Sequence, residues 1–205
     1  MPAGKAPRGD YALIAVGASA GGLLALSKLL QELSSDFPPM IVVQHLDPRH
    51  KSLMAGLLAR KTGKFVKDAE DGEVFKRGTV YICPPDEHVL VRRARIQLAH
   101  SRLVRFSRPS IDVLFASVAA VYGEHAIGVI LSGSNRDGTD GIAAIKRAGG
   151  VTIAQDPTTS EFRTMPQSAI DTGCVDYVLP LDTMGQAISQ IFEKGNPGKW
   201  QGKSI

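Results

Sequence analysis

The sequence predicts an α/β fold, with a doubly wound, mainly parallel sheet and an antiparallel hairpin region at one edge. Continuous apolar runs of strand length recur along the chain, with the composition of parallel strands covered on both faces. Amphipathic helical patterns alternate with these runs. The length of 205 residues, with 43% hydrophobic and 21% charged residues, suits one α/β domain around a single core.

The first part of the chain alternates strand, helix, strand and helix. A glycine-rich turn at 17–22 separates the first strand from a helix whose leucines recur at helical spacing, and the prolines at 38–39 lie beyond the end of that helix. The second strand ends in His45. The expected elements are strands at 11–16 and 40–45 and helices at 23–33 and 51–60.

The middle of the chain offers short apolar runs separated by turns. Asp71-Gly72 and Arg77-Gly78 are turn signals, and we interpret the segment 65–98 as antiparallel strands or hairpins inserted at one edge of the sheet. A loop is expected at 99–109. The short runs lie at 64–67, 79–83, 88–91 and 95–98.

Strand and helix alternation returns after the loop. Ser110 is a plausible cap for the next helix, and Gly149-Gly150 closes a later one. The loop at 132–141 follows the third apolar strand and is rich in polar residues and glycine. The expected elements are strands at 126–131, 151–154 and 175–178 and helices at 111–122, 142–147, 165–170 and 182–193.

Charge and hydropathy exclude several classes of protein. The net charge of +4 comes without a Lys/Arg block or an aromatic-interleaved basic stripe, so we expect no nucleic-acid partner. No apolar run has transmembrane length, and the first ten residues are not followed by a signal-peptide core, so we expect no membrane insertion. Cys83 and Cys174 both lie in apolar sequence, which predicts reduced thiols in a cytoplasmic protein.

The turn after the first strand has the pattern of a nucleophile elbow. Ser19 stands between Gly17 and Gly21, as in G-x-S-x-G. The glycines permit a tight turn that presents the hydroxyl beside the first free amides of a helix. Phosphate- and dinucleotide-binding loops share the strand, glycine-rich turn and helix, and a small serine can also merely fill such a turn.

Two further strand ends carry groups that complete a hydrolytic site. His45 ends the second strand, and Asp137 lies in the loop after the third. Sites in such sheets lie beyond the carboxyl ends of the strands, where a histidine can act as base and a carboxylate can hold its tautomer. Taken singly, His45 could bond a carbonyl and Asp137-Gly138 could be a simple turn. Their equivalent positions favour a Ser-His-Asp site.

Six motifs together make the chain resemble the catalytic domain of the CheB-type protein-glutamate methylesterases of bacterial chemotaxis, over about residues 13–190. The resemblance implies that Ser19 is the nucleophile, His45 the general base and Asp137 the orienting acid, with no cofactor or metal. The motifs are Gly-Ala-Ser-x-Gly-Gly at 17–22, Val-Val-Gln-His at 42–45, Arg-Pro-Ser-x-Asp-x-Leu-Phe at 108–115, Asn-Arg-Asp-Gly at 135–138, Ala-Gln-Asp at 154–156 and Met-Pro-x-x-Ala-Ile at 165–170.

The resemblance implies a function and a partner. It predicts hydrolysis of glutamate methyl esters on a methylated chemoreceptor or a similar methylated protein, with a possible protein-glutamine deamidase side activity. It places this activity in cytoplasmic signal transduction, in chemotaxis or a related system that a phosphorelay controls. We expect a flexible N-terminus at 1–10, the catalytic domain at 11–193 and a flexible tail at 194–205.

The chain departs from the family pattern in two ways. The family commonly has a Met-Gly pair in the loop before the acid, where this chain has Ser134 and Asn135. A side chain at Asn135 next to the catalytic Asp137 could reshape the pocket and its specificity. The first ten residues are also too few for the receiver domain usual in the chemotaxis enzymes, so we expect a stand-alone catalytic domain.

Two loops and several basic residues are expected to surround the triad. The oxyanion and substrate loops are predicted at Ala20 and Gly21 and at Gly133, Ser134 and Asn135, because backbone amides at a helix start can bind a developing negative charge. Basic residues are ordinarily solvated surface charges, but their position at strand ends favours substrate docking. The docking candidates are Arg136, Arg163 and Met165, together with Arg49, His50 and Lys51.

Other readings of the same residues are weaker. A nucleotide-binding or reductase domain would have an acidic residue where His45 stands. A metal site built from His45, Asp47 and His50 lacks a recognised spacing and a third strong ligand. A nucleophilic Cys83 is less favoured than a buried structural thiol. A non-catalytic or altered-specificity regulator that keeps the fold remains the alternative function.

Overall fold

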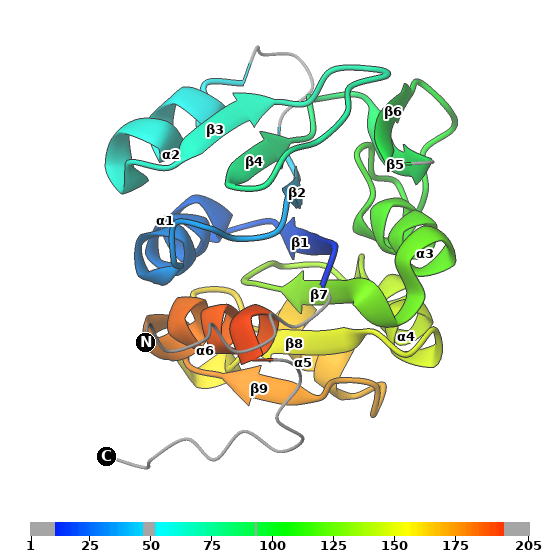
Figure 1. Ribbon diagram of the computed structural model, residues 1–205. Helices are drawn as coiled ribbons and strands as arrows, with labels where there is room; N and C mark the ends of the chain where they lie inside the picture. Colours follow the sequence, from blue (N-terminus) through cyan, green and yellow to red (C-terminus); the bar gives the residue numbers. More distant parts are fainter. Residues whose placement is uncertain (1–10, 47–51, 93, 195–205) are drawn as a thin grey trace.

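A seven-stranded, wholly parallel sheet forms the centre of the molecule (Figure 1). The computed structural model describes residues 11–46, 52–92 and 94–194. Strand β1 lies in the middle of the sheet, between β2 and β7. In spatial order the strands are β3 (Phe65–Asp68), β4 (Thr79–Ile82), β2 (Met40–Gln44), β1 (Leu13–Ala18), β7 (Ala126–Ile130), β8 (Val151–Gln155) and β9 (Tyr177–Leu179).

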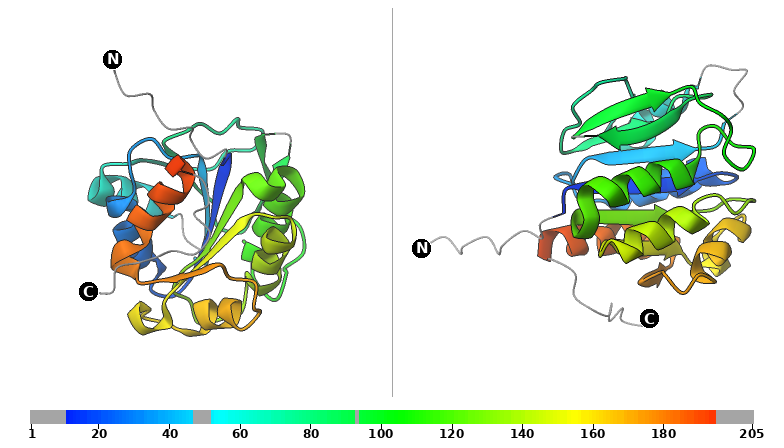
Figure 2. Two further views of the ribbon diagram at one scale, coloured as in Figure 1. Left: turned by 60° about the horizontal axis from the view of Figure 1, so that its bottom comes forward. Right: turned by 90° about the vertical axis from the view of Figure 1, so that its right-hand side faces the viewer.

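Helices cover both faces of the sheet and create two apolar cores (Figure 2). Residues of β1 alternate between them: Ile14 and Val16 face one core, and Leu13 and Ala15 face the other. This double burial explains the unbroken apolar runs in the sequence. The first core is covered by α1 (Gly22–Glu32), α2 (Met54–Thr62) and α6 (Leu181–Lys194), and the second by α3 (Ile111–Tyr122), α4 (Thr139–Arg147) and α5 (Thr164–Ile170).

The predicted fold class is confirmed, but the interpretation of 65–98 as antiparallel was wrong for its first half. Strands β3 and β4 pair in parallel, with Phe65 opposite Thr79, and extend the main sheet beyond β2. The turns at Asp71-Gly72 and Arg77-Gly78 lie in the connection from the carboxyl end of β3 to the amino end of β4. Because these two strands are parallel, the turns are not hairpin turns. Among the strands of the described residues, β5 (His88–Arg92) and β6 (Arg95–Ala99) form the one antiparallel pair, which lies against α3 (Figure 1).

Several element boundaries differ from the expected ones. Helix α4 begins at Thr139 rather than at Ile142, since the left-handed Gly138 (φ 95°) turns the chain into the helix. Short 3-10 turns at Gly123–His125 and Pro157–Thr159 were not predicted. The expected flexible N-terminus at 1–10 lies outside the described residues, as does the expected tail at 194–205 except for its first residue, Lys194, which ends α6.

The topology fixes where a site can form. The three central strands β2, β1 and β7 are adjacent and parallel, so their carboxyl ends lie at the same edge of the sheet. The edge beyond β2, β1 and β7 is therefore where the sequence-predicted groups can meet.

No helix in the described part of the chain is long and apolar enough to span a membrane.

Candidate active site

Ser19 lies in the tight turn between β1 and α1. Its backbone N–H donates to the carbonyl of Ser132 at 3.0 Å, which ties this turn to the loop after β7. Gly21 adopts a left-handed conformation with a φ of 73°, which glycine tolerates without strain. Helix α1 then begins at Gly22, so the Ser19 hydroxyl lies beside the amide-rich, positive end of a helix.

His45 follows directly on β2, and its ring joins the other two predicted groups. Its Nδ1 lies 3.2 Å from Ser19 Oγ, and its Nε2 lies 2.9 Å from Asp137 Oδ2. The side chain of His45 is 16% exposed, so the ring is largely shielded while remaining reachable from solvent. The structure thus brings Ser19, His45 and Asp137 together in one hydrogen-bonded chain.

Asp137 is held at the N-terminus of α3. Its carboxylate accepts hydrogen bonds from the Ser110 hydroxyl at 2.9 Å, from the Ile111 amide at 2.7 Å and from the Asp112 amide at 3.1 Å. Burial opposes its ionisation, yet the hydrogen bonds from His45 and from the two amides hold the pKa of Asp137 below its ordinary value. A buried carboxylate therefore stays ionised beside the imidazole.

The carboxylate fixes the tautomer of His45. An ionised carboxylate only accepts hydrogen bonds, so His45 Nε2 carries the ring hydrogen and donates it to Asp137. The other nitrogen, Nδ1, then presents its lone pair to the Ser19 hydroxyl. This is the arrangement that a base needs in order to take the proton of a serine nucleophile.

Gln44 supports this site and was not among the predicted site residues. Its Nε2 donates to the carbonyl of Ser19 at 2.7 Å and to that of His45 at 3.0 Å, so one amide links the Ser19 turn to His45. A Cβ added at Gly22 would lie 1.9 Å from Gln44 Oε1, which explains the second glycine of the turn. The sequence signals for Gln44 were its place beside His45 at a strand end and its position in the Val-Val-Gln-His motif at 42–45.

Two other polar side chains connect the loops around the site. The Ser132 hydroxyl donates to the carbonyl of Ala20 at 2.8 Å and accepts from the amide of Phe162 at 3.0 Å. Gln155 accepts from the Ser132 amide at 3.0 Å and donates to the carbonyl of Thr159 at 2.9 Å. Both side chains are buried, so these bonds fix the relative positions of three loops.

Some backbone amides of the predicted oxyanion loops have no hydrogen-bond partner in the part of the chain that the structure describes. Within the described residues, no hydrogen bond engages the backbone amides of Ala20, Gly21, Ser134 or Asn135. Gly133 does not qualify as a donor, because its amide is bonded to the carbonyl of Phe162 at 3.1 Å. Amides without partners next to a nucleophile can receive a developing negative charge.

Asn135 contacts the ring of His45. Its Nδ2 lies 3.1 Å from His45 Nδ1, and its Oδ1 accepts from the Asp137 amide at 3.1 Å. Sequence reasoning placed Asn135 in the substrate loop but gave it no contact with the histidine. That contact depends on the loop conformation between β7 and α4, which the residue types do not specify.

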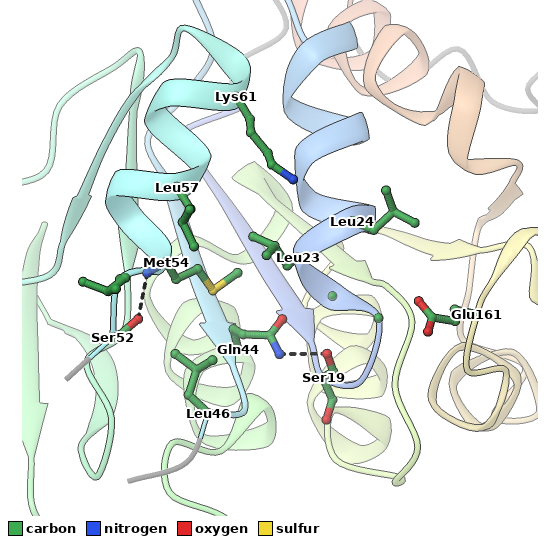
Figure 3. Close-up of a pocket in the computed structure, with 13 residues that line it drawn as sticks. Ser19, Leu23, Leu24, Gln44, Leu46, Ser52, Met54, Leu57, Lys61 and Glu161 are labelled. Carbon is green, nitrogen blue, oxygen red and sulfur yellow. Dashed lines mark hydrogen bonds between the residues drawn. The ribbon is translucent and has the colours of Figure 1, made fainter. Parts of the chain in front are cut away.

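An apolar cavity opens beside Ser19, between α1 and α2 (Figure 3). Its volume is about 670 Å³, far more than the side chain of one methylated glutamate requires. In Figure 3, Lys61 lies at the far end of α2, while Gln44 and Leu46 lie near Ser19. Leucines and methionine dominate the remaining lining: Leu23, Leu24, Leu53, Met54 and Leu57.

The predicted docking residues separate into exposed and buried ones. Arg136 and Arg163 are exposed. Met165 is only 1% exposed and packs where a Cβ on Gly133 would stand, so its assignment to the docking surface was wrong. The Met165 side chain, at the start of α5, instead packs against the loop that contains Gly133. Arg49, His50 and Lys51 lie outside the described residues.

The other candidate chemistries find little support. Burial raises the pKa of the Cys83 thiol, which keeps it protonated and unreactive. In the described part of the chain, no group of three His, Cys, Asp or Glu side chains is arranged to hold a metal ion. Asp47 and His50, which the metal alternative requires, are outside that part, and His45 is engaged with Ser19 and Asp137.

Comparison with known proteins agrees with the geometry. The CheB methylesterase family model matches residues 14–188. A putative protein-glutamate methylesterase/protein-glutamine glutaminase of Leptospira interrogans is 40% identical over 184 residues, which cover 89% of this chain and 95% of that protein. The protein-glutamate methylesterase/protein-glutamine glutaminase of Sulfurimonas denitrificans is also 40% identical, but the match covers 53% of its length.

A solved structure shows the same fold. The crystal structure of the Thermotoga maritima CheB methylesterase catalytic domain superposes with a TM-score of 0.84 at 34% sequence identity, covering 88% of this chain and 98% of that one. The family match extends from β1 into α6 and so includes all three strands that carry the candidate triad. The chain therefore belongs to the CheB methylesterase family.

Proposed function

We propose that this protein hydrolyses glutamate methyl esters on a protein substrate by a Ser-His-Asp mechanism. The observation that carries the proposal is the hydrogen-bonded chain from Ser19 through His45 to Asp137. Each member has the environment that its role requires: the serine at a helix N-terminus, the histidine partly reachable, and the acid buried and ionised.

The reaction proceeds through an acyl-enzyme. Ser19 Oγ attacks the side-chain carbonyl carbon of the methylated glutamate while His45 Nδ1 takes the serine proton. The C–O bond to the methoxy group then breaks, and the imidazolium returns the proton, so methanol leaves. Water attacks the acyl-enzyme with His45 again as base, which releases glutamate and restores Ser19. Asp137 remains ionised and stabilises the imidazolium throughout.

The backbone amides around the turn stabilise the tetrahedral intermediate. The amides of Ala20 and Gly21 lie at the start of α1, and those of Ser134 and Asn135 lie in the loop after β7. Both sets are free of other bonds in the described residues. These amides would form stronger hydrogen bonds to the oxyanion of the tetrahedral intermediate than to the carbonyl oxygen of the planar ester.

The substrate is a macromolecule in this proposal. The cavity beside Ser19 is too large and apolar to serve one ester side chain, so it also accommodates apolar side chains next to the methylated residue. A methylated chemoreceptor in bacterial chemotaxis, or a similar methylated signalling protein, fits the family membership. The names of the relatives add a glutaminase activity, for which the same acyl-enzyme would form with ammonia as the leaving group.

The test measures methanol release from a methylated chemoreceptor cytoplasmic domain that carries radiolabelled methyl groups. Wild type should release label, and Ser19→Ala should lose nearly all of that activity. Ser35→Ala is the matched control, because Ser35 is exposed and lies in the connection between α1 and β2, at the opposite end of β2 from His45. Equal activity in wild type and Ser19→Ala would reject the mechanism. A non-catalytic regulator would show no release from any variant.

A further inference from the structure

Two hydrogen-bond donors face the same nitrogen of His45. Ser19 Oγ lies 3.2 Å from Nδ1, and Asn135 Nδ2 lies 3.1 Å from it. The ring hydrogen belongs to Nε2, which donates to Asp137. A neutral imidazole then has a single in-plane lone pair, at Nδ1. The serine hydroxyl and the asparagine amide therefore compete for one acceptor.

The amide of Asn135 is held in the orientation that makes it compete. Its Oδ1 accepts from the backbone N–H of Asp137 at 3.1 Å, which directs Nδ2 toward the ring. The backbone φ of Asn135 is not positive, so its side chain occupies this place without backbone strain. The contact thus belongs to a defined loop conformation.

The two donors differ in what they can do. A serine hydroxyl can transfer its proton to the imidazole as Oγ attacks, whereas a carboxamide N–H does not ionise in the accessible pH range. Once the imidazolium forms, Nδ1 carries a hydrogen and can no longer accept from Asn135. The Asn135 bond therefore stabilises the resting enzyme but not the transition state, which raises the barrier to the reaction.

We propose that Asn135 is a positioning residue that restrains the general base, so that the resting enzyme is slower than its triad alone would make it. The inference rests on the proposed esterase function of Ser19 and His45. It predicts that Asn135 must release Nδ1 before or during attack, and that removing its donor accelerates the chemical step.

The kinetic test uses hydrolysis of p-nitrophenyl acetate by two variants. Asn135→Leu keeps the size and branching of the side chain and removes the donor, and Asn135→Gly removes the side chain. Both should raise kcat about fivefold with KM unchanged. This increase corresponds to an activation free energy lower by about 1 kcal/mol, which is the net contribution of an ordinary hydrogen bond. Unchanged or lower kcat in both overturns the proposal. A rise in Asn135→Gly alone also overturns it, because steric bulk would then be the cause.

A spectroscopic test detects the contact without relying on turnover. Nitrogen-15 NMR of labelled histidine should show His45 Nδ1 as a hydrogen-bond acceptor in Ser19→Ala, where Asn135 is the remaining donor. In Ser19→Ala/Asn135→Leu, the Nδ1 signal should move to the position of an unbonded imidazole nitrogen. Identical Nδ1 signals in the two proteins would overturn the proposal. If the NMR signal shows the contact but neither wild type nor any variant hydrolyses the ester, the esterase function would be refuted instead.

Discussion

At the scale of single residues, the site depends on keeping one buried carboxylate ionised. Asp137 has a side chain only 1% exposed, yet the Ser110 hydroxyl and the Ile111 and Asp112 amides point at it from the first turn of α3. These donors satisfy its lone pairs, and the helix end is positive. The charge of Asp137 then sets which nitrogen of His45 bears the proton.

Asp137→Asn should inactivate the enzyme while leaving the fold intact. An asparagine carboxamide can place its N–H against His45, which would move the ring hydrogen to Nδ1 and remove the acceptor for Ser19. By analogy with other serine hydrolases, kcat should fall by roughly 10³- to 10⁴-fold. Ester hydrolysis measures the loss, and circular dichroism checks the fold. A variant within tenfold of wild type would contradict the role of Asp137.

Asp112→Asn should stabilise the protein above pH 6. Burial, reinforced by the nearby charges of Asp137 and Asp140 and opposed by the Gly141 amide, raises the pKa of Asp112 to about 6. The folded state thus binds this proton more tightly than the unfolded state does, so stability falls as the pH rises from about 4 to about 6. The asparagine can still accept from Gly141 and carries no charge.

Thermal or urea unfolding of wild type and Asp112→Asn at several pH values checks this effect. The two proteins should be close in stability at pH 4, and the variant should be more stable by an amount of order 2 to 3 kcal/mol above pH 6.5. Loss of the 3.7 Å contact between Arg105 and Asp112 would subtract a smaller amount. A stability difference that does not change with pH would exclude Asp112 as the titrating group.

At the scale of elements, the turn between β1 and α1 is shaped by its neighbours. Gln44, at the end of β2, bonds the Ser19 carbonyl, and its side chain occupies the space above Gly22. Ser132, after β7, bonds the Ala20 carbonyl from the other side. The Ser19 turn is thus held by residues at the ends of both strands that flank β1, and its conformation does not depend on the turn residues alone.

Gly22→Ala should impair catalysis without unfolding the protein. The new Cβ would lie 1.9 Å from Gln44 Oε1, so Gln44 must move and its bonds to the Ser19 and His45 carbonyls should weaken. We expect kcat to fall by about tenfold or more, since small misplacements of reacting groups are costly. Gly56→Ala is the control, because its Cβ would meet nothing closer than 3.9 Å and should stabilise α2 by about 1 kcal/mol.

Ester hydrolysis and thermal unfolding of both glycine variants separate the two effects. Gly22→Ala should lose activity, and Gly56→Ala should keep activity and melt at a higher temperature. Full activity in Gly22→Ala would show that Gln44 does not position the serine turn.

The sequence predicted the elements of the central sheet and the three groups at its strand ends, because unbroken apolar runs and a glycine-rich turn are local signals. It did not predict that β3 and β4 join the sheet in parallel, since their short runs and turn residues are equally typical of hairpins. The bond from Ser110 to Asp137 replaces the helix cap expected of that serine. Such contacts depend on tertiary packing, which local patterns do not encode.

At the scale of the whole molecule, the triad lies between two surfaces that could contact a protein substrate. The apolar cavity extends from Ser19 between α1 and α2, where Leu24 and Leu53 are 55% and 74% exposed. Arg136 and Arg163 are exposed on the loops beyond β7 and β8. With a net charge of +4, the protein should meet an acidic partner faster at low salt.

Leu53→Asp should weaken hydrolysis of a methylated protein and spare that of a small ester. A carboxylate at this exposed, cavity-lining position would oppose burial of apolar side chains of the substrate. We expect kcat/KM for the methylated receptor domain to fall about tenfold, with p-nitrophenyl acetate hydrolysis unchanged. Val121→Asp, at the end of α3 away from Asp137, is a matched exposed control. Equal kcat/KM in both variants would remove the cavity from the docking surface.

Arg136→Ala and Arg163→Ala test the electrostatic part of docking. Each should lower kcat/KM for the receptor domain by a few-fold at low salt, and the difference from wild type should shrink as the ionic strength rises. Steady-state kinetics at salt concentrations from about 20 mM to about 500 mM measures this dependence, because the screening of exposed charges strengthens steadily over that range. Salt-independent rates equal to those of wild type would show that these arginines are ordinary solvated charges.

Trapping the acyl-enzyme is the most direct test of the mechanism. A peptide with one glutamate methyl ester is mixed with the enzyme, quenched in acid and analysed by mass spectrometry. We predict that the protein gains the mass of the peptide minus methanol, and that digestion locates the adduct on Ser19. Ser19→Ala should show no adduct. A peptide adduct on any other residue, or methanol release from Ser19→Ala at the wild-type rate, would contradict the assignment of Ser19 as the nucleophile.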